Sequence, residues 1–444
     1  MEEFDAIAYI NTPRWQQVSL GLERTQLLME KLGRPQDSLK FVHVAGTNGK
    51  GSTCVYTANI LQAAGLTTGM FTSPYIETFE ERIQVNGQLI PMDELKSVTL
   101  AVRDAAAEVE AETGEHPTEF ELMTAVGLCH FARRKCDIVV MEVGLGGRLD
   151  STNIIDAPEV AAIARIGLDH TALLGDTLAA VAGEKAGIIK AGSSVVSYPQ
   201  DPSAQEIIDA AAVAVGAQVV VPDFAQLRTG STAIVPDGEG KQLLVRTFDY
   251  GALTGLHTTL MGEYQPGNAA FAIEIVRALQ ARGWAVSEQN IRDGIQAARW
   301  PGRYEVFPHV PGTPWVVVDG GHNPQGIEAL RRTCEDVFPG KAPYVVLSLL
   351  ADKDYDSMTE TLADFAAGFV TMTPPNLRAL PGEELAKVLR GKCDACNRPQ
   401  VPIVVAESFD DARVKVMQLA GPEDLVVVSG SLYSVSTAKA AFRK

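Results

Sequence analysis

Hydrophobic and polar positions alternate between strand-like and helix-like patterns along most of this chain. LKFVHVAG (39–46) has a strand pattern, and GSTCVYTANILQAAG (51–65) after it has helical spacing. The continuous β-branched runs in CDIVVMEVG (136–144) and PEVAAIARIG (158–167) are typical of parallel strands buried on both faces. Residues 118–134 predict a helix. This rhythm predicts an α/β fold with a doubly wound, mostly parallel sheet.

The pattern changes in the middle of the chain and then resumes. Residues 218–260 contain short apolar runs broken by Gly and Asp, which predict a small antiparallel patch, and two helices follow at about 266–282 and 287–299. After RWPGR (299–303) strands and helices alternate again. We therefore predict two domains, 1–298 and 299–444, the second a smaller Rossmann-like α/β domain. RWPGR is the candidate hinge of a cleft that closes on a ligand.

Composition narrows the class of protein. The 444 residues carry a net charge of −17, so no general basic field attracts nucleic acid or an anionic membrane. No run of 18 or more apolar residues is present, and the acidic start MEEFDAIAYI lacks the basic region of a signal peptide, so we expect a cytoplasmic protein. Six cysteines are scattered, and the C-x-x-C pair in GKCDACNRP has no second pair, which favours free thiols in a surface loop over a metal or redox site.

The stretch GTNGKGS (46–52) joins a predicted strand to a predicted helix. Its glycines allow backbone N–H groups to approach phosphate oxygens, and Lys50 supplies a compact positive charge. The stretch departs twice from the pattern G-x-x-x-x-G-K-[ST], with Val44 in place of Gly and Gly51 in place of Ser or Thr. A phosphate site is favoured over a ligand-free turn.

Further polar residues stand where strands or helices are predicted to end. Glu142 ends a strand, where a hard oxygen ligand suits Mg²⁺, although it could instead cap the following GLGG turn. His170 follows a strand too, but a lone His is more often structural. Lys185 lies near a helix end and, from the pattern alone, is no more distinctive than Lys190. Asn268 opens a helix and could be a simple cap.

Ordered blocks over most of the chain carry a family resemblance. GTNGK resembles the Mur ligase superfamily, and GTNGKGS resembles its folylpolyglutamate synthase and dihydrofolate synthase branch. The other matching blocks are TSPYIETFEERIQVNG (72–87), HPTEFELMTA (116–125), MEVGLGGRLDSTN (141–153), GLDHTALLG (167–175), GEKAGIIK (183–190), GEYQPGNAA (262–270), RWPGR (299–303), DGGHNP (319–324) and LLADKD (349–354). The chain departs from the family at Tyr264, where His is usual, and at Gly320–Gly321.

The resemblance implies an ATP-dependent ligase that joins L-glutamate to dihydropteroate, to reduced folate or to both through an acyl phosphate. It implies catalytic roles for Lys50, His170 and Lys185. It also implies two Mg²⁺ ions, held by Ser73, Glu142, His170 and Lys185, with Lys185 carbamylated by CO₂. The implied ATP contacts are Thr47, Asn48, Gly49, Lys50, Gly51, Ser52, Asn268, Arg303 and Asp319.

The acceptor site is implied by the same resemblance. Its residues are Arg82, Thr118, Glu119, Phe120, Glu121, Leu149, Asp150, Ser151 and His322. Phe120 suits a flat heterocycle, and core packing is the alternative. Arg82 suits a folate carboxylate, and a solvated Glu–Arg pair is the alternative. His322 would contact either nucleotide or glutamate. A monomer without nucleic-acid or membrane partners is expected.

Three other functions are consistent with parts of the sequence. A monofunctional folylpolyglutamate synthase has the same motifs. A peptidoglycan Mur ligase requires an N-terminal domain for its nucleotide sugar, and only about 40 residues precede the glycine-rich loop. An ATP-binding switch without ligase activity would leave the carboxylate, histidine and lysine blocks without a purpose.

Overall fold

The computed structural model describes residues 4–12, 21–376 and 378–443. The chain divides into two compact units, and each is built around its own parallel sheet. The first unit comprises Met1–Tyr75, Phe79–Leu227 and Pro266–Ala297, and the second comprises Ile76–Thr78, Arg228–Gln265 and Ala298–Lys444. The α/β fold predicted from the sequence is confirmed.

The first unit contains an eight-stranded sheet in the order β4-β3-β2-β5-β1-β6-β7-β8. Strands β2, β5, β1, β6, β7 and β8 are parallel, and β3 and β4 add an antiparallel edge. Its strands are β1 (Phe41–Ala45), β2 (Thr68–Phe71), β3 (Ile83–Val85), β4 (Gln88–Leu89), β5 (Ile138–Glu142), β6 (Val160–Ile163), β7 (Ser194–Ser197) and β8 (Val219–Val220). Every residue of β1, β5 and β6 is buried, as their β-branched sequences predict.

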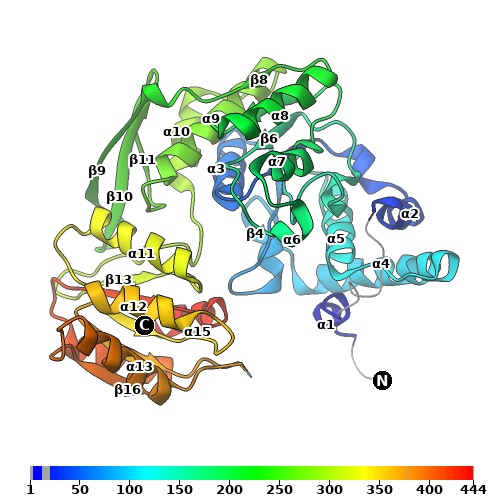
Figure 1. Ribbon diagram of the computed structural model, residues 1–444. Helices are drawn as coiled ribbons and strands as arrows, with labels where there is room; N and C mark the ends of the chain where they lie inside the picture. The colour runs from blue at the N-terminus through cyan, green and yellow to red at the C-terminus, as the bar shows by residue number, and fades with distance from the viewer. Residues whose placement is uncertain (1–3, 13–20, 377, 444) are drawn as a thin grey trace. The chain divides into compact units, whose positions relative to one another are not determined.

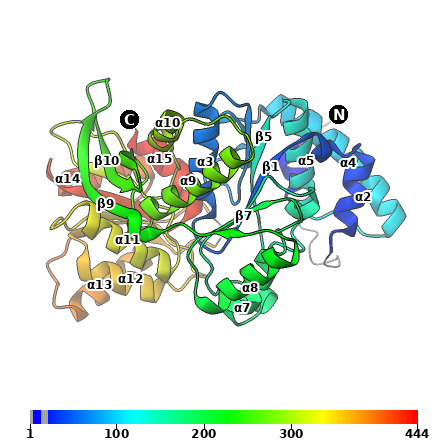
Figure 2. The same cartoon turned by 90° about the horizontal axis from the view of Figure 1, so that it is seen from above.

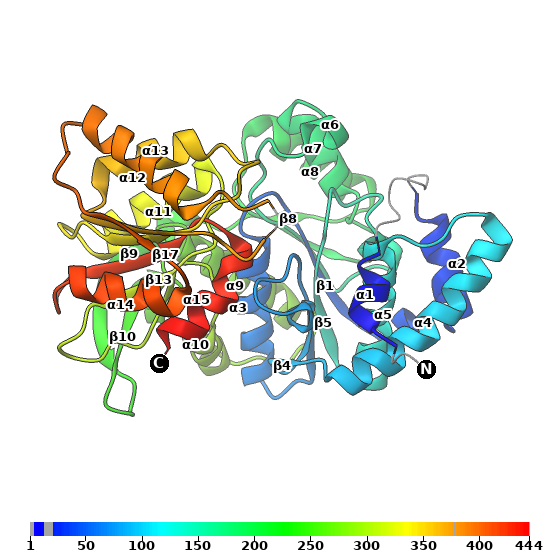
Figure 3. The ribbon, with the colours of Figure 1, turned by 90° about the horizontal axis from the view of Figure 1, so that it is seen from below.

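Helices cover this sheet in groups that differ in their packing partners, and one of these groups is α3 with α10. One group of helices, α1, α2, α4 and α5, packs together beside the sheet (Figure 3), and α7 packs on α8 (Figure 2). The helices of the unit are α1 (Ala6–Ile10), α2 (Glu23–Lys31), α3 (Lys50–Ala63), α4 (Met92–Thr113), α5 (Glu119–Arg133), α6 (Thr171–Leu174), α7 (Leu178–Ala186), α8 (Pro202–Ala214), α9 (Gln265–Ala281) and α10 (Glu288–Ala297). Short 3₁₀ turns are η2 (Pro35–Ser38), η3 (Phe79–Arg82), η4 (Ser151–Ile154) and η5 (Phe224–Gln226).

The second unit contains a six-stranded sheet, in the order β12-β13-β17-β14-β15-β16, and a three-stranded antiparallel sheet (Figure 1). The strands are β9 (Leu227–Pro236), β10 (Gln242–Tyr250), β11 (Leu253–Thr258), β12 (Glu305–Val306), β13 (Trp315–Val318), β14 (Tyr344–Leu347), β15 (Gly368–Met372), β16 (Ile403–Ala406) and β17 (Leu425–Ser429). The helices are α11 (Pro324–Val337), α12 (Tyr355–Phe365), α13 (Gly382–Ala395), α14 (Phe409–Leu419) and α15 (Leu432–Phe442).

Side-chain alternation assigns the valines of the second sheet to two cores. Val317 and Val427 belong to the core beside α11 and α12, whereas Val316, Val318 and Val426 belong to the core beside α14 and α15. Successive side chains of a strand point to opposite faces, so both faces of a parallel sheet need apolar residues. The alternation of strands and helices predicted after residue 303 is confirmed.

Three details differ from the sequence predictions. Residues 218–222 were predicted in the antiparallel patch, but β8 pairs in parallel with β7 in the first sheet. Residues 228–265 were predicted in the first domain, but they belong to the second compact unit, because Leu244 and Met261 pack in its core. Cys393 was predicted in a surface loop, but it is buried on α13, where its helical position faces the core.

A close helix contact in the first unit depends on one glycine. Gly294 of α10 lies against α3, and a β-carbon at this position would stand 2.4 Å from both N and Cα of Ile60. Because the obstruction is backbone, a substituted side chain cannot be accommodated by a rotamer change.

We expect Gly294→Ala to lower the free energy of unfolding by about 1–3 kcal/mol, because the helices must separate. The matched control is Gly391→Ala in α13, where no atom lies within 4 Å of the added carbon. Alanine there should raise stability by about 0.5–1 kcal/mol through helix propensity. Urea denaturation measures both, and equal effects would contradict the proposed backbone clash.

Candidate active site

The glycine-rich loop lies between β1 and α3 and is shaped by two close contacts. Gly49 is the N-cap of α3 and has φ +84°. A β-carbon on Gly49 would stand 2.8 Å from Oδ1 of Asn268, and one on Gly46 would stand 2.7 Å from Cβ of Ala164. Glycine is therefore required at both positions, and Gly49 allows the predicted ATP residue Asn268 to approach the loop from the first turn of α9.

The first residues of the loop are bonded to the segment that follows β6. The N–H groups of Thr47 and Asn48 both donate to the carbonyl of Arg165, at 2.9 and 3.0 Å. The Thr47 hydroxyl donates to the carbonyl of Gly167 at 3.0 Å and accepts from its N–H at 3.1 Å. The start of α3, at Lys50, Gly51 and Ser52, is the part of the loop that suits an anion, because the first N–H groups of a helix have no helical acceptors.

Two lysines contact carbonyl oxygens of this loop. Lys50 Nζ lies 3.3 Å from the carbonyl of Thr47, and Lys185 Nζ lies 2.9 Å from the carbonyl of Gly46. Lys185 lies at the end of α7 and is only 4% exposed. Burial, followed by the charge of Lys50, lowers the pKa of Lys185 to about 8. About a tenth of this amine is therefore neutral at about pH 7.

Glu142 and Ser73 meet beside the glycine-rich loop. Glu142 ends β5 and is opposite Val44 of β1 in the parallel register. It is 3% exposed, and its Oε2 accepts a hydrogen bond from the Ser73 N–H at 3.1 Å. A buried carboxylate at a strand end next to a phosphate loop, with a serine adjacent to it, offers the oxygen ligands that suit Mg²⁺.

His170 lies in a more open environment. It is the N-cap of α6, has φ +50°, and its side chain is 58% exposed. Its Nε2 is 3.8 Å from Oδ2 of Asp169. The Thr47–Gly167 hydrogen bonds hold the preceding part of this segment on the glycine-rich loop. Among described residues, no group of three or more His, Cys, Asp or Glu side chains forms a preassembled metal site.

Arg82 is packed against aromatic rings. Its guanidinium lies 4.8 Å from the ring centroid of Tyr75 and 5.7 Å from that of Phe79. Its buried Nε has no hydrogen-bond partner in the part of the chain that is described, and burial lowers its pKa. The alternative of a solvated Glu–Arg pair therefore does not describe this side chain. An anionic ligand would supply an acceptor for the buried Nε and offset the cost of burying the charge.

The start of α5 combines a buried polar cap with an aromatic ring. Thr118 and Glu121 form a capping box, and the Glu121 carboxylate is bonded within the protein. Glu119 and Phe120 are partly exposed. Phe120 contacts Phe71 edge-on, with centroids 6.1 Å apart, and a β-carbon on Gly144 would be 2.3 Å from its Cζ. Phe120 therefore packs against the loop that follows Glu142 and still presents part of its surface.

The turn at 149–151 is fixed by one buried carboxylate. Asp150 accepts from the Thr152 N–H at 3.0 Å and hydroxyl at 2.5 Å, and from the Leu145 N–H at 2.8 Å. Burial raises the pKa of Asp150 despite these bonds. Ser151 is buried and bonded to the Thr124 hydroxyl at 2.8 Å, whereas Leu149 is 41% exposed.

The predicted residues of the second unit surround the end of β13. Asp319 accepts hydrogen bonds from the N–H groups of Tyr304 and Gly321, each at 2.8 Å, and burial raises its pKa. His322 Nδ1 is 2.9 Å from the carbonyl of Gly320. Arg303 is partly buried, and its charge opposes the rise in the pKa of Asp319. Asp319 thus joins the segment that carries Arg303 to the turn that carries His322.

Sequence reasoning did not identify three residues that organise the site. Arg24 binds Glu121, Arg165 supplies the carbonyl that holds the glycine-rich loop, and His43 lies beneath the loop in β1. His43 Nε2 contacts the Thr152 hydroxyl at 2.9 Å. A polar residue inside the apolar run FVHVA is the one sequence signal that singles out any of them.

Comparison with known proteins identifies the class of protein. The model of the Mur ligase middle domain matches residues 44–276, and that of the Mur ligase glutamate ligase domain matches residues 302–432. These matches and the nucleotide loop define an ATP-dependent ligase of the Mur type. Within the described residues, no helix is long and apolar enough to cross a membrane.

Full-length relatives narrow the class further. The chain is 35% identical to the folylpolyglutamate synthase of Lacticaseibacillus casei, covering 99% of this chain and 98% of that one. It is 37% identical to the dihydrofolate synthase/folylpolyglutamate synthase of Bacillus subtilis, covering 94% of each. The structure of Mycobacterium tuberculosis folylpolyglutamate synthase complexed with ADP and AMPPCP matches with a TM-score of 0.78 and 30% identity, over 96% of both chains. The chain belongs to the dihydrofolate synthase/folylpolyglutamate synthase family.

His43 should make stability depend on pH. Burial, with the charge of Lys190, lowers the pKa of His43 to about 3 from 6.5. The unfolded state then binds more protons than the folded state below pH 6.5, so stability falls as pH decreases through that range. Between about pH 7.5 and about pH 5.5, wild type should lose about 1.4 kcal/mol more than His43→Gln.

Urea denaturation at the two pH values measures this difference. His257→Gln, the same change at a partly exposed histidine of β11, is the matched control for the loss of a histidine outside the core. An identical pH dependence in wild type and His43→Gln would show that His43 is not held neutral in the folded protein.

Proposed function

We propose that this protein ligates L-glutamate to the carboxylate of a pteroyl acceptor, either dihydropteroate, a reduced folate or both, and converts ATP to ADP and phosphate. The observation that carries the proposal is the contact of Glu142 with Ser73 beside the β1–α3 phosphate loop, in a chain that matches this ligase family along its length. Lys50 and the start of α3 form the phosphate-binding part of the site.

The chemistry follows from the poor reactivity of a carboxylate. A carboxylate oxygen attacks the γ-phosphorus of ATP, the bond to the bridging oxygen breaks, and ADP and an acyl phosphate form. The glutamate amine then attacks the carbonyl carbon, loses a proton, and expels phosphate as the C–O bond breaks. Lys50 offsets charge on the phosphates, and Phe120 offers a face for the pterin ring.

Mg²⁺ fits the residues at the end of β5. Glu142 is a buried carboxylate, and Ser73 adds a hydroxyl, while Mg²⁺ sites commonly take one or two carboxylates and complete their coordination with phosphates and water. Bound there, the ion would neutralise phosphate charge. A second ion would need Lys185 as a carbamate, because an ammonium group has no lone pair to offer, with His170 supplying nitrogen.

The remaining assignments are proposals of the same kind. Asn268, Arg303 and Asp319 are proposed on the ATP side, and His322 on the ATP or glutamate side. Arg82 is proposed for an acceptor carboxylate, and its unpartnered buried Nε supports this role. We also propose a cytoplasmic monomer, since ATP and glutamate are cytoplasmic metabolites. The two-domain boundary at residues 298–299 stays a proposal.

The test is glutamate-dependent ADP release, with dihydropteroate and tetrahydrofolate in parallel and products identified by mass. Turnover with both acceptors establishes a bifunctional enzyme, and turnover with one alone identifies the synthase. Lys50→Ala should abolish turnover while the circular dichroism spectrum is retained, because the phosphate cation is lost. Retained turnover in this variant would overturn the phosphate-loop assignment, and no effect of glutamate with either acceptor would overturn the function.

Lys185 should react with CO₂, because burial leaves part of the amine neutral. We expect native mass spectrometry in bicarbonate to show the mass of one added CO₂, increasing from about pH 7 to about pH 9 around the pKa of about 8. Lys185→Met should lack the adduct. Lys190→Met is the control: burial lowers the pKa of Lys190 too, but its amine donates to two carbonyls, those of Asn153 and Ile155, whereas that of Lys185 donates to one, so Lys190 should not carry the adduct. An adduct that persists in Lys185→Met would place the modification elsewhere.

A further inference from the structure

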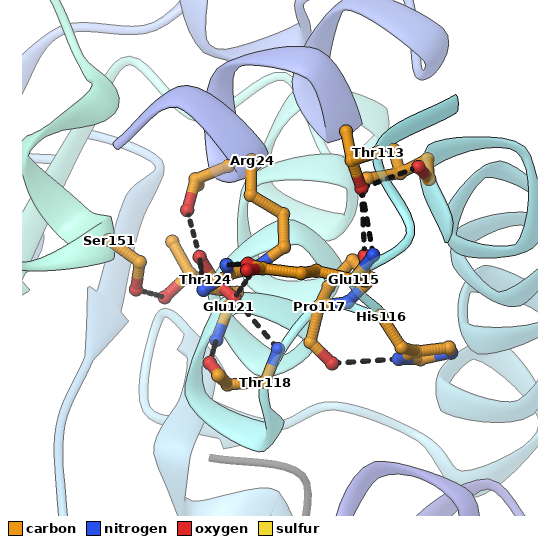
Figure 4. Close-up of polar contacts among 11 residues, drawn as sticks. Arg24, Thr113, Glu115, His116, Pro117, Thr118, Glu121, Thr124 and Ser151 are labelled. Carbon is orange, nitrogen blue, oxygen red and sulfur yellow. Dashed lines mark hydrogen bonds and ion pairs between the residues drawn. The ribbon is translucent and has the colours of Figure 1, made fainter. Parts of the chain in front are cut away.

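A buried arginine of α2 forms a hydrogen-bonded ion pair with the first turn of α5, which carries predicted contacts of the pteroyl acceptor. Arg24 donates from Nε to Oε2 of Glu121 at 2.9 Å and from Nη2 to Oε1 at 3.1 Å (Figure 4). Its third nitrogen, Nη1, donates to Oε2 of Glu115 at 2.6 Å. Arg24 is 8% exposed and Glu121 is 5% exposed, so the pair is bidentate and largely removed from water.

The Glu121 carboxylate is fully engaged by protein groups. In addition to Arg24, it accepts from the Thr25 hydroxyl at 2.8 Å. It also accepts from the Thr118 N–H at 2.7 Å, while the Glu121 N–H donates to the Thr118 hydroxyl (Figure 4). Two oxygens with four donors have little capacity left for a ligand. Glu121 therefore fixes the first turn of α5 instead of presenting a charge to the acceptor.

The first turn of α5 carries the partly exposed residues that are predicted to contact the pteroyl acceptor. Glu119 and Phe120 lie between the two capping residues and are partly exposed. Phe120 is confined by Phe71 and Gly144, and one turn further on Thr124 is bonded to Ser151. Any shift of the α5 start would therefore move the ring relative to the turn at 149–151.

Arg24 is the strongest support of this arrangement from outside α5. Removing it would leave a buried carboxylate without its two guanidinium donors, and Glu121 would have to move toward water or take up a proton. Movement toward water would break the Thr118–Glu121 cap, and protonation would weaken the hydrogen bonds that the carboxyl accepts. Arg24 and Glu121 are hydrogen-bonded to each other and to Glu115, Thr25 and Thr118, which all lie outside the nucleotide loop.

We propose that Arg24 is a positioning residue for the pteroyl acceptor, acting through Glu121 to set where Phe120 stands. The inference rests on the proposed ligase function. It makes α2, which carries no matched family block, a determinant of acceptor affinity. Loss of Arg24 should raise the KM for the acceptor and leave the KM for ATP nearly unchanged.

The experiment compares Arg24→Met, Arg24→Lys and the control Arg34→Met in the full chain. Arg34 pairs with Asp37 on the surface, so its change removes the same charge from an exposed site. Arg24→Met should raise the acceptor KM about tenfold, which equals about 1.4 kcal/mol, with the KM for ATP within about twofold of wild type. Arg24→Lys keeps the charge but loses the bidentate hydrogen bonding. Its KM for the acceptor should therefore lie between those of wild type and Arg24→Met.

The outcomes separate the two proposals. If wild type shows no acceptor-dependent turnover, the proposed function fails, independently of Arg24. If wild type turns over and both KM values change equally in Arg24→Met, or neither changes, the positioning role is overturned. If Arg24→Met fails to fold by circular dichroism, Arg24→Lys carries the test, and an acceptor KM equal to that of Arg34→Met would overturn the role.

Discussion

The hydrogen bonds from Thr47 and Asn48 to the carbonyl of Arg165 are the constraint on which the nucleotide site depends. They join the loop after β1 to the segment after β6, two strands that are neighbours in the sheet. Because β5 lies on the other side of β1, Glu142 is brought to the same edge. The carboxyl ends of three adjacent parallel strands thus supply cation, carboxylate and backbone dipoles at one place, as open α/β sheets commonly do.

Strands and helices could be predicted from the sequence where burial alone determines the hydrophobic pattern. The runs that became β1, β5 and β6 are apolar throughout, and the start of α3 at a glycine-rich turn follows from local chemistry. The prediction was wrong for Val219–Val220, because a two-residue strand pairs equally well with a parallel or an antiparallel neighbour. Only tertiary contacts determine which neighbour it pairs with. The buried position of Cys393 was not predicted, because the polar residues around it resemble a loop although α13 continues to Ala395.

Site residues were predictable only where motif chemistry is local. Lys50 stands out in a glycine-rich turn at a helix start and Glu142 at a strand end, whereas Lys185 became distinctive only through its burial against the Gly46 carbonyl. Arg24 lies 97 positions from Glu121, so no sequence window contains the pair. Glu121 also shows the limit of reading an acidic residue as a ligand contact, since its oxygens are used by the protein itself.

The order of segments in the first unit has a consequence for how the chain acquires its structure during synthesis. The unit is interrupted by Arg228–Gln265 and completed by Pro266–Ala297, which supply Asn268 beside Gly49 and Gly294 against α3. A nascent chain ending at residue 227 would have β1 and its loop but neither of these two partners. The nucleotide-binding unit can therefore reach its final packing only after the ribosome has also made the antiparallel sheet. Until then, the face of α3 that contacts α10 stays unpacked.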